Sequence, residues 1–261
     1  MAVNLKLGSG SFTYEVSPEW ENLPDGYSWT DAAGVAVDSQ DRVFVFNRGE
    51  HPIIIFDSDG NFLSSWGEDI FTKAHGITIG PDDMLYCTDE GDHTVRKCTP
   101  EGEVLLTIGT PGQPSKPYGG DPFNRCTDVA IDPLNGDLYV SDGYVNARVH
   151  KYSPDGNLLF SWGSPGTDPG EFNLVHNIAT DKDGLVYVAD RENHRIQVFD
   201  RKGKFQTQWN DMHWPCAIYI SDDQIVYVGE LGAGMTVNQA TPNIGPRIAV
   251  MNTKGERLDR I

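Results

Sequence analysis

Internal repetition constrains the fold of this chain more than any other feature. One pattern of about 40 to 50 residues occurs five times, with copies that begin at Ala33, His75, Thr127, His176 and Cys216. Each copy has four short apolar or alternating segments separated by polar turns. Four antiparallel strands at this period are typical of one β-propeller blade, and no long stretch carries a helical period. The sequence therefore predicts an all-β propeller.

The copies set the expected blade boundaries at about 33–67, 75–109, 127–163, 176–209 and 216–261, within a single domain over 1–261. The fifth copy is looser and carries an insertion before RIAVMN. The N-terminal segment FTYEVSPEW (12–20) reads as one extra strand, of the kind that completes the last blade of a closed ring. Five legible blades and one orphan strand indicate either an unusual closure of the ring or a six-bladed pattern that lacks one blade. We favour the second, and we expect this segment to pair at the open edge.

Glycine recurs before the fourth strand of every copy. At a tight hairpin turn the backbone has a positive φ, which glycine adopts without steric cost. The five glycines are Gly60, Gly102, Gly156, Gly203 and Gly255.

The charge excludes two classes of partner. Twenty Lys and Arg against 38 Asp and Glu give a formal net charge of −18, which repels nucleic acid and anionic membrane surfaces. No run reaches the roughly 18 apolar residues of a membrane span, and the start MAVNLKLGSGSF lacks the apolar core of a signal peptide. Four cysteines do not make a disulfide framework. These features predict a cytoplasmic protein, and they leave the oligomeric state open.

Two histidines occupy equivalent positions at the starts of first strands. In a propeller these strands line the central channel, so His75 and His176 are expected to converge at one mouth. Neutral imidazole is a common zinc ligand, and Cys216 shares their position and is a candidate third ligand. The alternative is a pair of channel histidines bonded to water and backbone.

The ends of the second strands supply a further ring of side chains at the same mouth. Aspartates there are typical caps of turns. Arg48, Tyr144 and Arg191 break the pattern of the repeat, which indicates separate tasks for them.

Several of these segments resemble one known family. VFNRGEH, AHGITI, SDGYVNAR, LVHNIA and ADRENHRIQ are similar to the peptidyl-α-hydroxyglycine α-amidating lyases, which are NHL-repeat propellers, and the similarity extends over about 33–200. The resemblance implies zinc at His75 and His176, active-site roles for Arg48, Tyr144 and Arg191, and a structural calcium held by the backbone carbonyls of Val35 and Ile77. The third zinc histidine of that family belongs to its sixth blade, which has no counterpart here.

The activity that the resemblance implies is metal-dependent cleavage of the C–N bond in a peptidyl- or acyl-α-hydroxyglycine, which yields an amide and glyoxylate. Tyr144 would be the general base, and an arginine would hold the carboxylate of this small-molecule or peptide substrate. One alternative is a non-catalytic NHL propeller that binds a peptide, protein or small ligand at its charged mouth. Another is a lactonase-type hydrolase, but such propellers generally hold calcium with carboxylate and Asn ligands.

Overall fold

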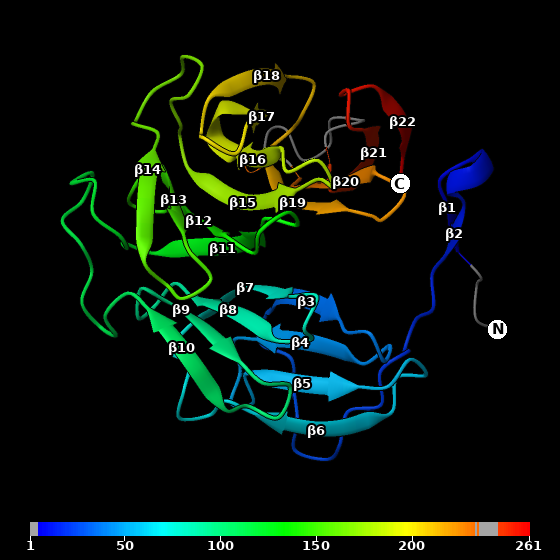
Figure 1. Cartoon of the computed structure of the whole chain (residues 1–261). Helices are drawn as coiled ribbons and strands as arrows, with labels where there is room; N and C mark the ends of the chain where they lie inside the picture. Colours follow the sequence, from blue (N-terminus) through cyan, green and yellow to red (C-terminus); the bar gives the residue numbers. More distant parts are fainter. Residues whose placement is uncertain (1–4, 233, 235–244) are drawn as a thin grey trace.

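The computed structural model describes residues 5–232, 234 and 245–261, and these form five antiparallel four-stranded sheets. Figure 1 shows the sheets arranged as the blades of a propeller around a common centre. In each blade the strands follow chain order from the innermost to the outermost. The predicted all-β propeller with five blades is therefore confirmed.

The observed strands match the copies of the repeat closely. Blade one contains β3 (Ala32–Val37), β4 (Val43–Asn47), β5 (Ile53–Phe56) and β6 (Phe62–Trp66), and blade two contains β7 (Ala74–Ile79), β8 (Leu85–Asp89), β9 (Thr94–Cys98) and β10 (Val104–Ile108). Blade three contains β11 (Cys126–Ile131), β12 (Leu138–Asp142), β13 (Arg148–Tyr152) and β14 (Leu158–Trp162). Blade four contains β15 (Val175–Thr180), β16 (Val186–Asp190), the short 3-10 helix η2 (Arg191–Asn193), β17 (Arg195–Phe199) and β18 (Phe205–Trp209). Blade five contains β19 (Pro215–Ile220), β20 (Ile225–Glu230), β21 (Arg247–Asn252) and β22 (Arg257–Arg260). Most of the insertion between β20 and β21 lies outside the described residues.

The apolar core is divided among the contacts between blades. Four buried clusters are found within the described chain, one between each pair of consecutive blades. Inner strands pack in the same order: β3 on β7, β7 on β11, β11 on β15, and β15 on β19. The described residues form no fifth cluster between blade five and blade one, and Val35 and Val37 on β3 are 64% and 54% exposed. The ring is therefore open at this seam.

Tryptophans at the ends of outer strands connect consecutive blades. The five turn glycines all have positive φ, between 73° and 97°, so the expectation for these turns is confirmed. At three of them a Cβ would also approach within 2.3–2.9 Å of the indole of the preceding blade. These pairs are Trp66 with Gly102, Trp162 with Gly203, and Trp209 with Gly255.

The N-terminal segment differs from its prediction. It adds no strand to a blade, because β2 (Tyr14–Glu15) pairs with β1 (Lys6–Leu7) in a separate two-stranded sheet. The 3-10 turn η1 (Gly10–Phe12) folds the segment back on itself. The hairpin nevertheless meets blade five, where the Tyr14 and Tyr227 hydroxyls lie 2.8 Å apart. Farther along, the Trp20 indole donates to the Ser58 carbonyl of blade one at 3.1 Å. The segment thus touches both sides of the seam.

Two further expectations concern cysteines and membranes. All four cysteines are free thiols, in agreement with the absence of a disulfide framework. In the described part of the chain no helix has the length and apolar character that crossing a bilayer requires.

A buried side chain at the end of each second strand fixes the start of the inner strand. Its oxygen accepts a backbone N–H from the segment that leads into the first strand of the same blade, so it joins positions 16 to 18 residues apart. The expected capping of nearby turn amides is confirmed at Asp89, which accepts from Gly91 and Asp92, but each aspartate also binds an amide far from it in sequence. The pairs are Asn47 with Thr30, Asp89 with Thr72 and Lys73, Asp142 with Asn124, Asp190 with Asn173, and Glu230 with His213.

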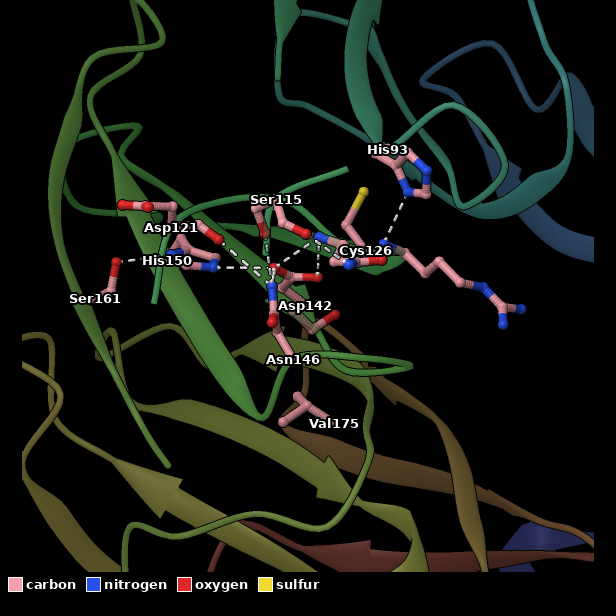
Figure 2. A network of polar contacts seen from close by, with 12 residues as sticks. His93, Ser115, Asp121, Cys126, Asp142, Asn146, His150, Ser161 and Val175 are labelled. Carbon is pink, nitrogen blue, oxygen red and sulfur yellow. Dashed lines mark hydrogen bonds and ion pairs between the residues drawn. The ribbon is translucent and has the colours of Figure 1, made fainter. Parts of the chain in front are cut away.

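In blade three this interaction is part of a larger buried network of hydrogen bonds around Asp142 (Figure 2). Asp142 accepts hydrogen bonds from the Asn124 amide at 3.0 Å and from the Asn146 side chain at 2.7 Å. The His150 imidazole bonds Asp142 through Nε2 at 3.2 Å and Ser161 through Nδ1 at 2.7 Å. Asn146 also reaches the Ser115 hydroxyl at 3.2 Å. The network holds the loop after β12 against the segment before β11.

We predict that Asp142→Asn lowers the free energy of unfolding by on the order of 3 kcal/mol, because an amide cannot accept from all of these buried donors. Urea denaturation at pH 7 measures the change. Asp155→Asn, at an exposed turn of the same blade, is the matched control and should change stability by less than about 0.5 kcal/mol. Equal stabilities of the two variants would contradict the assigned role of Asp142.

Candidate active site

The two histidines predicted to converge lie together at one mouth of the channel. His75 is on β7 and His176 is on β15, and their ring centroids are 4.9 Å apart at an interplanar angle of 60°. The blade between them supplies a third residue, Tyr144, from the loop held by the Asp142 network. The Tyr144 hydroxyl lies 3.1 Å from Nε2 of both histidines.

Backbone carbonyls of the next blade determine the tautomers of both histidines. His75 Nδ1 lies 2.6 Å from the Thr127 carbonyl oxygen, and His176 Nδ1 lies 2.7 Å from the Cys216 carbonyl oxygen. A carbonyl can only accept, so each Nδ1 carries the proton and each Nε2 keeps its lone pair. The Tyr144 hydroxyl has one hydrogen and can donate to only one Nε2 at a time. The site therefore holds more acceptors than donors.

Both imidazoles are neutral at pH 7. Burial lowers the pKa of His75 to about 4, with a further lowering from Arg48 and Arg191. Burial and the neighbouring His75 lower the pKa of His176 to about 3. Neutral imidazoles whose N–H groups bond carbonyls are the form in which histidine binds metal ions.

Arginines surround Tyr144. The Arg191 guanidinium carbon lies 5.8 Å from the centroid of the Tyr144 ring, and its Nε donates to Glu192 at 2.9 Å. Arg48 donates through Nε to the Ala74 carbonyl at 2.9 Å, directly before His75. Arg48, Tyr144 and Arg191 thus come from three blades to the histidine pair, as the broken repeat pattern indicated.

Two residues that the sequence analysis did not single out join this group. The Arg125 guanidinium carbon lies 4.6 Å from the Tyr144 ring centroid, closer than that of Arg191. Arg125 is bonded to the buried carboxylate of Glu90. A signal existed for both residues. Glu90 occupies the position after the second strand that holds Arg48 and Arg191 in other copies, and Arg125 lies two residues before the first-strand position of the histidines.

Cys216 does not complete a set of three ligands. Its thiol donates to the Gly229 carbonyl at 3.3 Å, and its backbone carbonyl, not its sulfur, faces His176. The register of β19 shifts between Pro215 and Ala217, and the same shift occurs at His176 and His75. The hydrogen bond of the thiol, and not the strand register, therefore separates Cys216 from the two histidines. The part of the chain that the structure describes contains no group of three or more His, Cys, Asp or Glu side chains that could hold a metal ion.

The residues predicted to hold calcium lie on adjacent inner strands. Val35 is on β3 and Ile77 on β7, and a Cβ at Gly34 would come within 3.0 Å of the His75 carbonyl oxygen. The two strands therefore run in close contact. The calcium assignment stays a prediction.

A cavity of about 300 Å³ opens beside Tyr144, between blades three and four. Ala147 and Phe172 are buried apolar residues of its lining. The backbone segments 165–167 and 173–174 form further walls, and Tyr118 lies at its edge. This space can accommodate a small organic group next to Tyr144.

Comparison with known proteins places these residues in a family context. The NHL repeat model matches residues 172–199. Human NHL repeat-containing protein 3 is 31% identical, over 89% of this chain and 71% of its own length. Peptidyl-alpha-hydroxyglycine alpha-amidating lyase 1 of Drosophila melanogaster is 36% identical over 58% of this chain, but only 30% of its own length is covered. Peptidyl-glycine alpha-amidating monooxygenase B of Xenopus laevis is 34% identical over 67% of this chain and 24% of its own length.

Solved structures share the architecture. A streptogramin B lyase structure aligns with a TM-score of 0.64 over 89% of this chain and 70% of that chain. A chain of a nidogen–laminin complex aligns with a TM-score of 0.65 over 88% of this chain and 79% of that chain. Both are 16% identical in sequence, so they show the fold alone.

The neutral histidines predict a pH dependence of stability. Because folding lowers their pKa, the unfolded chain binds more protons below pH 6.5, and stability falls as the pH drops from about 6.5 toward 4. The loss is on the order of 3 kcal/mol per histidine. A His75→Gln/His176→Gln variant should lose less stability than the parent over this range in urea titrations with a chelator present. His51→Gln, at an imidazole paired with Glu68, is the control and should follow the parent. Parallel curves for the parent and the double variant would contradict the assigned burial of the pair.

Proposed function

The chain belongs to the family of NHL-repeat propellers that includes NHL repeat-containing protein 3 and the peptidyl-α-hydroxyglycine α-amidating lyases, and we propose that it is a metal-dependent carbon–nitrogen lyase. Its substrate would be a peptidyl- or acyl-α-hydroxyglycine, and its products an amide and glyoxylate. One observation carries the proposal: two neutral histidines direct their Nε2 lone pairs at a single tyrosine hydroxyl.

The chemistry of the donor set fits zinc. Imidazole nitrogen is a preferred ligand of this metal, and ligating histidines usually donate their other N–H to a carbonyl or carboxylate. His75 and His176 meet both conditions, and together they offer more lone pairs than Tyr144 can satisfy. Zinc held there would supply Lewis acidity that lowers the pKa of a hydroxyl group bound to it.

Tyr144 is the proposed general base. Its oxygen lies 3.1 Å from Nε2 of both histidines, where the substrate hydroxyl would be presented, and the Arg125 and Arg191 guanidinium groups lie beside the ring. Tyr144 would enter the cycle as the phenolate, after releasing its own proton to solvent. The substrate hydroxyl proton then passes to the phenolate oxygen, and the C–O bond becomes the carbonyl of glyoxylate. The C–N bond then breaks, and its electron pair stays on the amide nitrogen. Tyr144 returns the proton to that nitrogen, so no other reactant is consumed.

The rest of the site would orient the substrate. Guanidinium groups bind carboxylates in a planar, bidentate arrangement, and Arg48 of blade one and Arg191 of blade four are the arginines that would supply it. The acyl group on the other side of the scissile bond has room in the cavity lined by Ala147 and Phe172. Positioning of this kind is a main source of catalysis when the base and the leaving group must be aligned.

A second candidate function is a binding propeller without turnover. It is favoured by the two-histidine donor set, because catalytic zinc usually has three protein ligands. Such a module would use the same charged mouth to hold a peptide, protein or small anionic ligand. Fold alone does not separate the two functions.

Turnover distinguishes them. We expect zinc-loaded protein to release glyoxylate from N-benzoyl-α-hydroxyglycine, and Tyr144→Phe to reduce the rate by roughly 10²–10⁴-fold, because the general base is lost while the ring stays in place. Tyr219→Phe, at an exposed tyrosine of blade five, is the matched control and should retain the parent rate. Elemental analysis of the purified protein accompanies the assay. Absence of glyoxylate at saturating zinc would leave the binding module as the function, whereas full activity of Tyr144→Phe would show that Tyr144 is not the general base.

A further inference from the structure

Arg125 combines an anchored backbone with a side chain that is accessible at the mouth. Its guanidinium lies over the Tyr144 ring at 4.6 Å, and its side chain is 40% exposed at the mouth. Its backbone amide donates to His93 Nδ1 at 3.0 Å, which anchors the residue from the neighbouring blade. The side chain is therefore both fixed and accessible.

Glu90 holds this guanidinium by one edge. Arg125 Nε and Nη2 donate to Glu90 Oε2 at 2.9 and 2.5 Å. The remaining edge, formed by Nη1 and the second hydrogen of Nη2, has the geometry that binds the two oxygens of a carboxylate. Arg125 Nη1 donates no hydrogen bond to any of the described residues.

Glu90 also connects Arg125 to Arg48. Its side chain is only 2% exposed, and its Oε1 lies 2.9 Å from Lys73 Nζ and 3.8 Å from Arg48 Nη2. Burial raises the pKa of Glu90, but hydrogen bonds from Lys73 and Arg125 outweigh burial and lower it. One buried carboxylate thus faces three cations. Asp31 also lies 3.6 Å from Arg48 Nη1, and the group still keeps a net positive charge in a chain of net charge −18.

We propose that Arg125, positioned by Glu90, forms with Arg48 a paired-arginine clamp for the carboxylate of the bound ligand. This inference rests on the proposed function for the identity of the ligand, an N-acylglycine-type carboxylate. Glu90 acts as a positioning residue: it comes from blade two and tethers guanidinium groups of blades one and three. Pairing both arginines to one carboxylate in advance reduces the conformational entropy lost when the ligand binds.

The clamp is tested with two unreactive ligands that differ in one charge. N-benzoylglycine and N-benzoylglycinamide both lack the α-hydroxyl, so neither is turned over, and calorimetry gives the ratio of their affinities. The parent should prefer the acid, and Arg125→Gln should reduce that preference roughly 10- to 100-fold while amide binding stays constant. Glu90→Gln should also reduce the preference, whereas a purely structural role would weaken both ligands equally.

Two further variants make the result specific. Arg125→Lys keeps the cation but loses the planar fork, so it should retain only part of the preference, and it carries the test if Arg125→Gln does not fold. Arg257→Gln removes an exposed arginine paired with Asp211 on blade five and should leave the preference unchanged. An equal acid-to-amide ratio in the parent and Arg125→Gln, or no preference in the parent, overturns the clamp.

The glyoxylate assay keeps the two proposals apart. If zinc-loaded protein releases no glyoxylate but the Arg125-dependent preference is present, the clamp is supported and only the lyase activity fails. If glyoxylate is released and Arg125→Gln leaves the preference unchanged, the clamp fails and the lyase proposal stands.

Discussion

The structure depends on one repeated interaction, the buried side-chain oxygen at the end of each second strand. In every blade it accepts an amide from the segment that leads into the inner strand. An unpaired buried carboxylate would be costly, so this pairing leaves the inner strand only one place to begin. The residues after the second strand and those at the start of the inner strand lie on either side of the same contact. Arg191 and His176 of blade four, for example, lie on either side of the contact between Asp190 and the Asn173 amide.

A second repeated interaction orders the site across blades. His75 donates to a carbonyl of blade three and His176 to a carbonyl of blade five, while the Thr127 hydroxyl of blade three donates to the Val175 carbonyl of blade four. Each inner strand thus fixes a side chain of the blade before it. Because these carbonyls take the Nδ1 protons, both histidines present Nε2 as an acceptor toward Tyr144. The tautomers of the two histidines therefore follow from the order of the blades. The open seam between blades five and one leaves these contacts intact.

Much of this architecture could be predicted from the repeat. The turn glycines mark hairpins of positive φ, and the observed strands begin within about one residue of the expected starts. The convergence of His75 and His176 followed from their equivalent positions, since equivalent positions in a propeller meet at one mouth. The prediction for the N-terminal segment was wrong, because the alternation of apolar and polar residues in a short isolated strand does not specify which strand it pairs with. Glycines and a 3-10 turn instead folded it onto β1.

The sequence by itself determined the blade pattern, the channel position of the histidines and the departure of Arg48, Tyr144 and Arg191 from the repeat. These properties follow from local periodicity and from comparison of the copies with one another. Only the tertiary structure decided that Cys216 turns its thiol toward Gly229, that Tyr144 bridges both imidazoles, and that Glu90 tethers Arg125 over the Tyr144 ring. Such contacts join side chains of different blades, and their geometry depends on how the blades pack and on which donors are buried with which acceptors. The position of a residue in the repeat specifies neither the packing of the blades nor the pairing of buried donors with acceptors.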